Sequence, residues 1–176
     1  MEKQISLFNS DSNQAKHTKK NSWSLYVDGA SRGNPGPAGI GIYINGGKDQ
    51  IHKKGFFLGK KTNNQAEYCA LACALFLLHK ILKKEEIVIG HLDIYSDSEL
   101  LIKQMNRIYK VRDTNLQLLK KVIDVQLHSF SYRFTHVRRE QNTIADELAN
   151  KGIDTKNALP TAFVTFIRTV IANDKT

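Results

Sequence analysis

The segment from Trp23 to Ile44 constrains the fold more than any other part of the chain. Apolar and polar residues alternate from Trp23 to Asp28, a pattern that predicts a half-buried β-strand. The turn Gly-Asn-Pro-Gly-Pro at residues 33–37 then reverses the chain, and the apolar residues up to Ile44 predict a second strand. Asp28 therefore stands where an apolar strand ends. A buried carboxylate is costly without a partner, so the position favours a metal ion, while a turn-capping aspartate is the alternative.

Hydrophobic periodicity divides the remaining chain into strands and helices. Short connections make the first three strands antiparallel, and a helical crossover makes the fourth and fifth strands parallel neighbours. The sequence therefore predicts an α/β fold with a mixed five-stranded sheet. Strands are predicted at residues 23–28, 38–44, 50–58, 92–95 and 131–135, and helices at residues 63–83, from residue 100, at 114–128 and at 144–149.

The helix predicted at residues 63–83 is apolar on almost all sides, which is typical of a helix buried against a sheet. Asn63 or Asn64 is the expected N-cap. Glu67 follows in the expected first turn, where a carboxylate next to an apolar surface is an anomaly. A favourable interaction of Glu67 with the helix N-terminus is the structural alternative to a functional role.

Four carboxylates occupy related positions in this predicted fold. Asp28 and Asp97 end strands, and Glu67 and Asp146 lie near the starts of helices. In open α/β sheets, sites form at the carboxyl ends of the strands. Four converging carboxylates without cationic partners would repel one another, and Mg²⁺ or Mn²⁺ would relieve that repulsion. A carboxylate site for two such ions suits in-line displacement at a phosphodiester.

The charge balance favours an acidic polymer as partner. The formal net charge is +9 and the pI is about 9.5, which favours nucleic acid first and an anionic membrane second. Cys69 and Cys73 are expected to fill core space in a reducing compartment. Residues 1–20 lack a secretory apolar region, and the apolar run at 68–78 is shorter than the roughly 20 residues that a membrane span needs. A cytoplasmic protein without a membrane partner is the expectation.

The N-terminal residues 1–21 are polar and predict a flexible arm, apart from Gln-Ile-Ser-Leu-Phe at residues 4–8. This peptide resembles the short motif by which bacterial replication and repair proteins dock on the sliding clamp. The resemblance implies that Leu7 and Phe8 anchor in an apolar pocket and that Gln4 supplies hydrogen bonds. An arm that folds back on the domain is the alternative.

The C-terminal residues 155–176 form a tail whose role the sequence leaves open. Its apolar residues between 159 and 171 would suit packing on the domain. They would equally suit contact with a partner.

Four sequence motifs, taken together, resemble a known family. They are Tyr-Val-Asp-Gly-Ala-Ser-Arg-Gly-Asn-Pro-Gly-Pro-Ala-Gly (26–39), Thr-Asn-Asn-Gln-Ala-Glu-Tyr (62–68), Tyr-Ser-Asp-Ser-Glu (95–99) and His-Val-Arg-Arg-Glu-Gln-Asn-Thr-Ile-Ala-Asp-Glu-Leu-Ala (136–149). With these motifs the chain resembles type 1 ribonuclease H over residues 22–154. The resemblance implies strand order 3-2-1-4-5 with helices on both faces of the sheet. It also implies an endoribonuclease that cuts the RNA strand of RNA–DNA hybrids, leaving 5′-phosphate and 3′-hydroxyl ends; a monomer is expected.

By the same resemblance, the four carboxylates hold two Mg²⁺ ions, for which Mn²⁺ can substitute. Asp28 is expected to bridge both ions, Glu67 and Asp97 to complete the ion on the leaving-group side, and Asp146 to complete the ion that holds the attacking water. His136 matches the family's loop histidine, which is thought to help proton transfer or product release. An exposed loop histidine without a task is the alternative.

Hybrid recognition requires the protein to detect 2′-hydroxyls on one strand and deoxyribose on the other. Asn34, Asn63 and Asn64 match the family's amides that read the minor groove, and capping or turn formation would also explain them. Thr62 matches the residue that holds a DNA phosphate. Glu99 departs from the glutamine of some relatives and, when ionised, can only accept hydrogen bonds.

Residues 106–113 form a short link where some family members insert a basic helical handle. Hybrid affinity is therefore expected to depend on scattered Lys and Arg side chains, or on recruitment through the N-terminal arm. Two other functions stay open: a non-catalytic hybrid-binding module, and a related nuclease that acts on DNA or single-stranded RNA. Acidic residues at all four positions disfavour the first, because a binder would gain from neutral or basic ones. The asparagine set disfavours the second.

Overall fold

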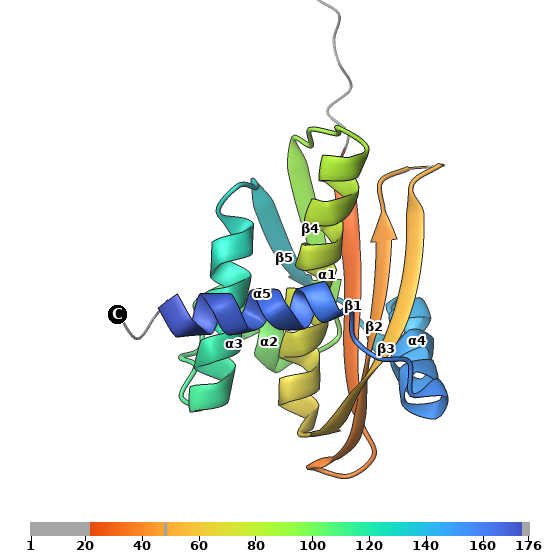
Figure 1. The fold of residues 1–176 in the computed structure, drawn as a ribbon, viewed down its shortest axis with the longest axis vertical. Helices are drawn as coiled ribbons and strands as arrows, with labels where there is room; N and C mark the ends of the chain where they lie inside the picture. Colours follow the sequence, from red (N-terminus) through yellow and green to blue (C-terminus); the bar gives the residue numbers. More distant parts are fainter. Residues whose placement is uncertain (1–21, 48, 174–176) are drawn as a thin grey trace, which may run out of the picture.

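The strands form one sheet with helices on both faces (Figure 1). The computed structural model describes residues 22–47 and 49–173. The strand order is β3-β2-β1-β4-β5; β1, β2 and β3 are antiparallel, and β4 runs parallel to both β1 and β5. The predicted α/β class, strand order and strand directions are therefore confirmed. The strands are β1 (Ser22–Ser31), β2 (Gly36–Asn45), β3 (Ile51–Lys61), β4 (His91–Ser96) and β5 (Tyr132–His136).

The predicted helices are present, and one more helix follows them. α4 continues to Thr155, beyond the short stretch that the sequence predicts. α5 forms in the C-terminal segment that the sequence left open. The helices are α1 (Asn63–Lys84), α2 (Glu99–Met105), α3 (Thr114–Leu127), α4 (Thr143–Thr155) and α5 (Thr161–Ala172), with a 3₁₀ turn, η1 (Arg139–Gln141), before α4.

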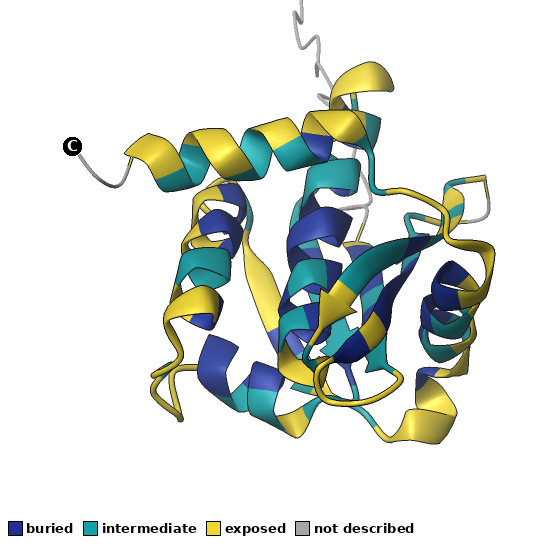
Figure 2. Cartoon of the chain, turned by 60° about the horizontal axis from the view of Figure 1, so that its bottom comes forward, coloured by how far each residue is buried: buried dark blue, intermediate teal, exposed yellow. Residues whose placement is uncertain are grey.

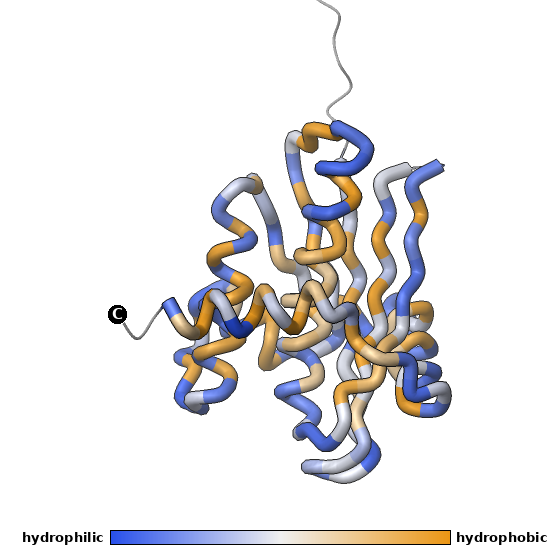
Figure 3. Tube along the Cα trace, in the orientation of Figure 1, coloured by the Kyte–Doolittle hydropathy of each residue, from blue (hydrophilic) through white to orange (hydrophobic). Residues whose placement is uncertain are grey.

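The alternation in β1 sorts side chains between the two faces of the sheet. Trp23, Leu25 and Val27 are fully buried in the core on the face that α1 covers. α1 is apolar on nearly all sides because it packs on the sheet, lies beside α3 and is crossed by α5 (Figures 2 and 3). Within the described part of the chain, α1 also has the length and apolar composition of a membrane span, as a core helix of this kind can.

Glycines allow α4 to approach the other face of the sheet at backbone distance. Gly41 pairs with Asp28 across the ladder, and a Cβ at Gly41 would overlap the Ala145 carbonyl oxygen of α4. A Cβ at Gly39 or Gly55 would collide with the α4 backbone in the same way. Because glycine has no side chain, the first turn of α4 can lie next to Asp28.

The apolar C-terminal segment packs on the domain. The backbone carbonyl of Asn157 accepts a hydrogen bond from the backbone N–H of Phe57 in β3 at 2.7 Å. α5 then lies across α1 and α3 (Figure 1), where the fully buried Phe163 ring lies 5.4 Å from the Phe76 ring of α1, measured between centroids. Of the two possibilities left open for this segment, packing on the domain is the one observed in residues up to Asn173.

Two details at the start of α1 correct the sequence prediction. Thr62, and neither Asn63 nor Asn64, is the N-cap: its hydroxyl accepts from Gln65 N–H at 3.2 Å, and the Gln65 side chain accepts from Thr62 N–H at 3.1 Å. This reciprocal pair satisfies two free backbone donors and makes Asn63 the first helical residue, the start that the sequence predicts. Glu67 consequently lies in the second turn.

The N-terminal predictions lie outside the described residues. They comprise the arm at residues 1–21, the peptide at 4–8, and Gln4, Leu7 and Phe8 within it.

Candidate active site

The four carboxylates predicted from the sequence line one cavity of about 430 Å³. Asp28 lies within β1 and not at the strand end that the sequence predicted, because pairing with β2 continues the strand to Ser31. Asp97 directly follows β4, as predicted. Glu67 comes from the second turn of α1, and Asp146 from the first turn of α4. The cavity thus lies at the carboxyl ends of two adjacent parallel strands, as expected for an open α/β sheet.

Asp28 is the electrostatic centre of this cavity. Its side chain is buried, and burial is the main cause that raises its pKa from 3.8 to about 7. The negative charges of Asp97 and Asp146 raise the pKa further, while the positive charge of Arg139 lowers it. An ionised Asp28 is therefore held at a free-energy cost in the absence of a cation.

Glu67 is held against β1 by the backbone of Gly29. The Gly29 N–H donates to Glu67 Oε2 at 3.2 Å, and a Cβ on Gly29 would overlap the Glu67 backbone nitrogen. Burial raises the pKa of Glu67 well above its usual value, and the charges of Asp28 and Asp97 add to the effect. The close strand–helix contact therefore presents this carboxylate to the cavity.

Asn142 holds Asp97 in place, and sequence reasoning missed this role. Its Nδ2 donates to Asp97 Oδ1 at 2.6 Å and to the carbonyl oxygen of Val27 at 3.0 Å. Asn142 is almost completely buried, and its side chain does not cap α4, although it stands at the cap position. An asparagine directly before a helix is typical of an N-cap, so the sequence gives no sign of this bridge between β1 and Asp97.

Arg139 is a cationic partner of the carboxylates that the sequence analysis did not identify. Its Nη2 lies 2.6 Å from Asp146 Oδ1, and the guanidinium also interacts with the charges of Asp28 and Asp97. The Asp146 side chain is 25% exposed and the Arg139 side chain 71%. The ion pair with Asp146 therefore forms at the open side of the cavity.

The donor set fits hard divalent cations. Carboxylate oxygens are the ligands that Mg²⁺ and Mn²⁺ prefer. Burial first, and neighbouring carboxylates second, raise the pKa values of Asp28 and Glu67, so a bound cation would favour their ionised forms. Among the described residues, no three acidic, histidine or cysteine side chains stand close enough to form a cage around one ion. Two of the four carboxylates are held by other side chains, Asp146 by Arg139 and Asp97 by Asn142.

His136 lies beside the site rather than in it. Its Nε2 is 3.2 Å from the backbone oxygen of Asp97, its side chain is exposed, and it is not among the residues that line the cavity. The geometry places His136 at the end of β5, next to the segment that carries Asp97. Its proposed part in proton transfer or product release stays a prediction.

The residues predicted to contact a hybrid gather beside the cavity. Asn34 Oδ1 accepts from the backbone N–H of Asn63 at 3.1 Å, which ties the β1–β2 turn to the start of α1. Asn63 lines the cavity, and Asn64 is exposed in the same turn of α1. Thr62 caps that helix. The four side chains therefore share one rim, where capping and substrate contact are compatible.

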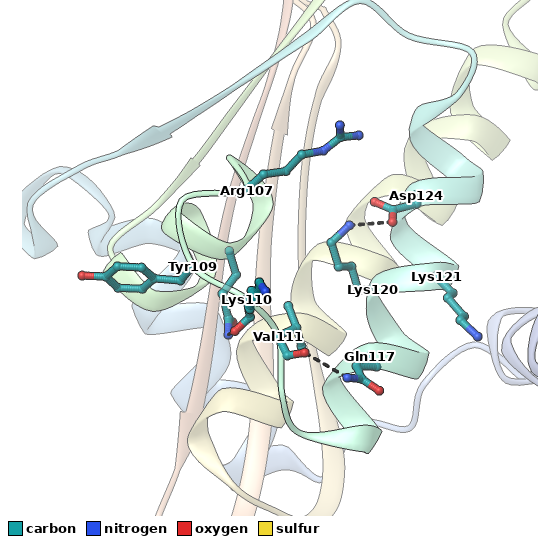
Figure 4. Close-up of a pocket in the computed structure, with 9 residues that line it drawn as sticks. Arg107, Tyr109, Lys110, Val111, Gln117, Lys120, Lys121 and Asp124 are labelled. Atoms are coloured by element: carbon teal, nitrogen blue, oxygen red, sulfur yellow. Dashed lines mark hydrogen bonds and ion pairs between the residues drawn. The ribbon is translucent and has the colours of Figure 1, made fainter.

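A separate basic hollow of about 580 Å³ lies between the α2–α3 link and α3 (Figure 4). Arg107 and Lys110 of the link and Lys120 and Lys121 of α3 line it, and Lys120 pairs with Asp124 at 2.6 Å. The link is short, as predicted, and carries no inserted helix. Positive charge therefore gathers at this link even without a handle.

Comparisons with known proteins agree on one family. A family model described as reverse transcriptase-like matches residues 26–152. Ribonuclease HI of Halobacterium salinarum is 36% identical over 131 residues, covering 73% of this chain and 63% of that protein. Ribonuclease H of Coxiella burnetii is 33% identical over 147 residues, covering 74% of this chain and 88% of that protein. The chain spans 35% of the length of a bifunctional protein of Mycobacterium tuberculosis, to which it is 35% identical.

Solved structures extend this similarity to the fold. LC11-RNase H1, crystallised in complex with an RNA/DNA hybrid, matches with a TM-score of 0.70 and 38% identity over 76% of this chain and 97% of that one. RNase H1 of Halobacterium salinarum matches with a TM-score of 0.67 and 35% identity over 76% of this chain and 98% of that one. The similarity therefore covers nearly the whole of both solved chains.

Proposed function

This chain belongs to the type 1 ribonuclease H family, and from that premise we propose that it is a metal-dependent endoribonuclease that hydrolyses the RNA strand of RNA–DNA hybrids. The observation that carries the proposal is the convergence of Asp28, Glu67, Asp97 and Asp146 on one cavity. A relative 38% identical in sequence was crystallised with an RNA/DNA hybrid, which supports the same substrate here.

The four carboxylates would hold two Mg²⁺ ions. When bound, such a pair supplies an activated water and stabilises the leaving oxygen, which accounts for 5′-phosphate and 3′-hydroxyl ends. The chain's own groups fix the ligands: the Gly29 N–H orients Glu67, and Asn142 ties Asp97 to β1. Because these partners are themselves held by backbone contacts, the carboxylates need little rearrangement when the substrate arrives.

Substrate selection follows from groups on the rim of the cavity. Amides both donate and accept hydrogen bonds, so Asn34, Asn63 and Asn64 suit 2′-hydroxyls and base edges in the minor groove. Thr62 suits a DNA phosphate. The net charge of +9 and the basic hollow at Arg107 and Lys110 favour a polyanion, whose phosphates would release counterions on binding.

A substrate panel tests the proposal directly. We expect the protein to cleave a labelled RNA–DNA hybrid with Mg²⁺ and to leave single-stranded RNA and duplex DNA intact. EDTA should abolish the cleavage, because the carboxylates alone repel the scissile phosphate. Binding of the hybrid without cleavage would instead identify a non-catalytic module, and cleavage of duplex DNA or single-stranded RNA would identify a related nuclease of different specificity.

We also propose that residues 4–8 recruit the enzyme to a bacterial sliding clamp. The support is the sequence of the peptide, with two large apolar side chains at the end of a polar arm. The intact protein should bind an immobilised clamp, and Leu7→Ala/Phe8→Ala should lower the affinity at least about tenfold, since two buried anchors are removed. Equal binding of both proteins would dispose of the proposal, and hybrid cleavage in solution serves as the folding control.

A further inference from the structure

Arg139 and a divalent cation would use the same carboxylate. The guanidinium donates to Asp146 Oδ1 at 2.6 Å, and Arg139 lines the same cavity as the four carboxylates. The positive charge of Arg139 also interacts with the negative charges of Asp28 and Asp97. A cation supplied by the chain itself therefore already compensates part of the negative charge that makes the cavity attractive to metal ions.

The backbone of Arg139 is fixed, whereas its side chain is not enclosed. Arg139 begins η1, in which Gln141 N–H donates to the Arg138 carbonyl at 2.8 Å. Asn142, buried and bonded to both β1 and Asp97, anchors the end of this turn. The Arg139 side chain is 71% exposed, so it can leave Asp146 without disturbing the fold.

We propose that Arg139 competes with divalent cations for Asp146 and so sets the affinity of that side of the cavity for metal. A guanidinium at ion-pair distance occupies one carboxylate oxygen and repels a second positive charge placed beside it. A cation that binds Asp146 must therefore displace Arg139. Asp28, Glu67 and Asp97, which form no direct ion pair with Arg139, are the part of the cavity that fills first. This inference rests on the metal dependence of the proposed function.

Mn²⁺ titration of the EDTA-stripped protein, followed by calorimetry in the absence of nucleic acid, tests the competition. Arg139→Gln removes the guanidinium charge and keeps a long polar side chain. The weaker Mn²⁺ site should bind about fivefold more tightly in this variant, the effect expected for removing a partly exposed ion pair. Arg138→Gln, which makes the same change of net charge one residue earlier, should alter the affinity less than about twofold.

A double-mutant cycle with Asp146→Asn isolates the pair. In the Asp146→Asn background, Arg139→Gln should change Mn²⁺ affinity less than about twofold, because the shared ligand is gone and only the weaker interaction with Asp28 and Asp97 is left. Equal Mn²⁺ binding by the wild type and Arg139→Gln would overturn the inference while leaving the metal-dependent function intact. An equal gain in both arginine variants would overturn it as well, since it would reflect net charge alone. Failure of every variant and the wild type to bind Mn²⁺ would refute the metal dependence itself, and the inference with it.

Discussion

Asp28→Asn should reduce hybrid cleavage at least about a thousandfold at saturating Mg²⁺, a loss of about 4 kcal/mol in transition-state stabilisation. Asp28 interacts with the charges of Glu67, Asp97 and Asp146, so it is the carboxylate that links the two sides of the cavity. The substitution removes one negative ligand while preserving shape. The measurement is the single-turnover cleavage rate of a labelled hybrid.

The matched control for this loss is Asp49→Asn. Asp49 is an exposed aspartate between β2 and β3, and it lines neither the carboxylate cavity nor the basic hollow. Its replacement makes the same chemical change and should leave the cleavage rate within about twofold of the wild type, as surface substitutions usually do. Retention of more than a tenth of the activity by Asp28→Asn would contradict the proposed role of Asp28.

Asp28→Asn should also stabilise the folded protein when EDTA has removed divalent cations. The folded state binds the Asp28 proton more tightly than the unfolded chain does, because the pKa rises from 3.8 to about 7. The stabilisation that comes from this tighter proton binding is fully present below about pH 4, and it is lost as the pH rises through about 7. At about 1.4 kcal/mol for each pKa unit, the cost of the ionised group is at most about 4 kcal/mol.

Urea unfolding at two pH values measures this gain. At pH 8, Asp28→Asn should raise the free energy of unfolding by about 2 kcal/mol or more, since local relaxation reduces the full cost. At pH 4 the two proteins should be nearly equal, because Asp28 is then protonated and close to asparagine in shape. A gain of the same size at both pH values would show that charge is not its cause.

Gly41→Ala should destabilise the fold by about 3 kcal/mol, near the upper end for overpacking a core. The added Cβ would overlap the Ala145 carbonyl and lie 2.6 Å from the Ala149 backbone nitrogen, so α4 must move away from the sheet. Asp146 moves with α4. Hybrid cleavage by the folded fraction should therefore fall about tenfold or more, since small misplacements of a catalytic group are costly.

Gly59→Ala is the control that distinguishes the effect of displacing α4 from the effect of backbone strain alone. A Cβ at Gly59 meets nothing within 4 Å, but the residue has a φ of +73°. The alanine should cost about 1 kcal/mol through its left-handed conformation and leave cleavage unchanged. If Gly41→Ala behaved like Gly59→Ala in both thermal unfolding and cleavage, the close approach of α4 would not matter to the site.

Periodicity predicted the strands and helices, and strand ends drew attention to Asp28 and Asp97, whereas the strand order was implied by the resemblance to the family. Trp23, Leu25 and Val27 alternate with less buried residues, so their side chains lie on one face of the sheet. This pattern involves only residues close together in the sequence and can therefore be predicted from it. Asp28 and Asp97 follow from it, because the ends of adjacent parallel strands meet at one edge of the sheet.

The side-chain pairings around those acids could not be predicted in this way. The contact of Arg139 with Asp146 depends on the path of η1, and the bond from Asn142 to Asp97 joins residues 45 positions apart. The cap at Thr62 was missed because three successive residues can each cap a helix, and the partner Gln65 decides among them. The packing of α5 depends on the surface that α1 and α3 present together.

The contact between Asn157 and Phe57 bears on self-association. β3 is an outermost strand of the sheet, and such strands offer unpaired backbone groups to other chains. The segment at Asn157 and Ala158 pairs with Phe57 and so closes part of that edge, while α5 covers apolar side chains of α1. A chain that stopped before Asn157 would expose both the unpaired edge of β3 and an apolar surface on α1, and we expect such a chain to aggregate.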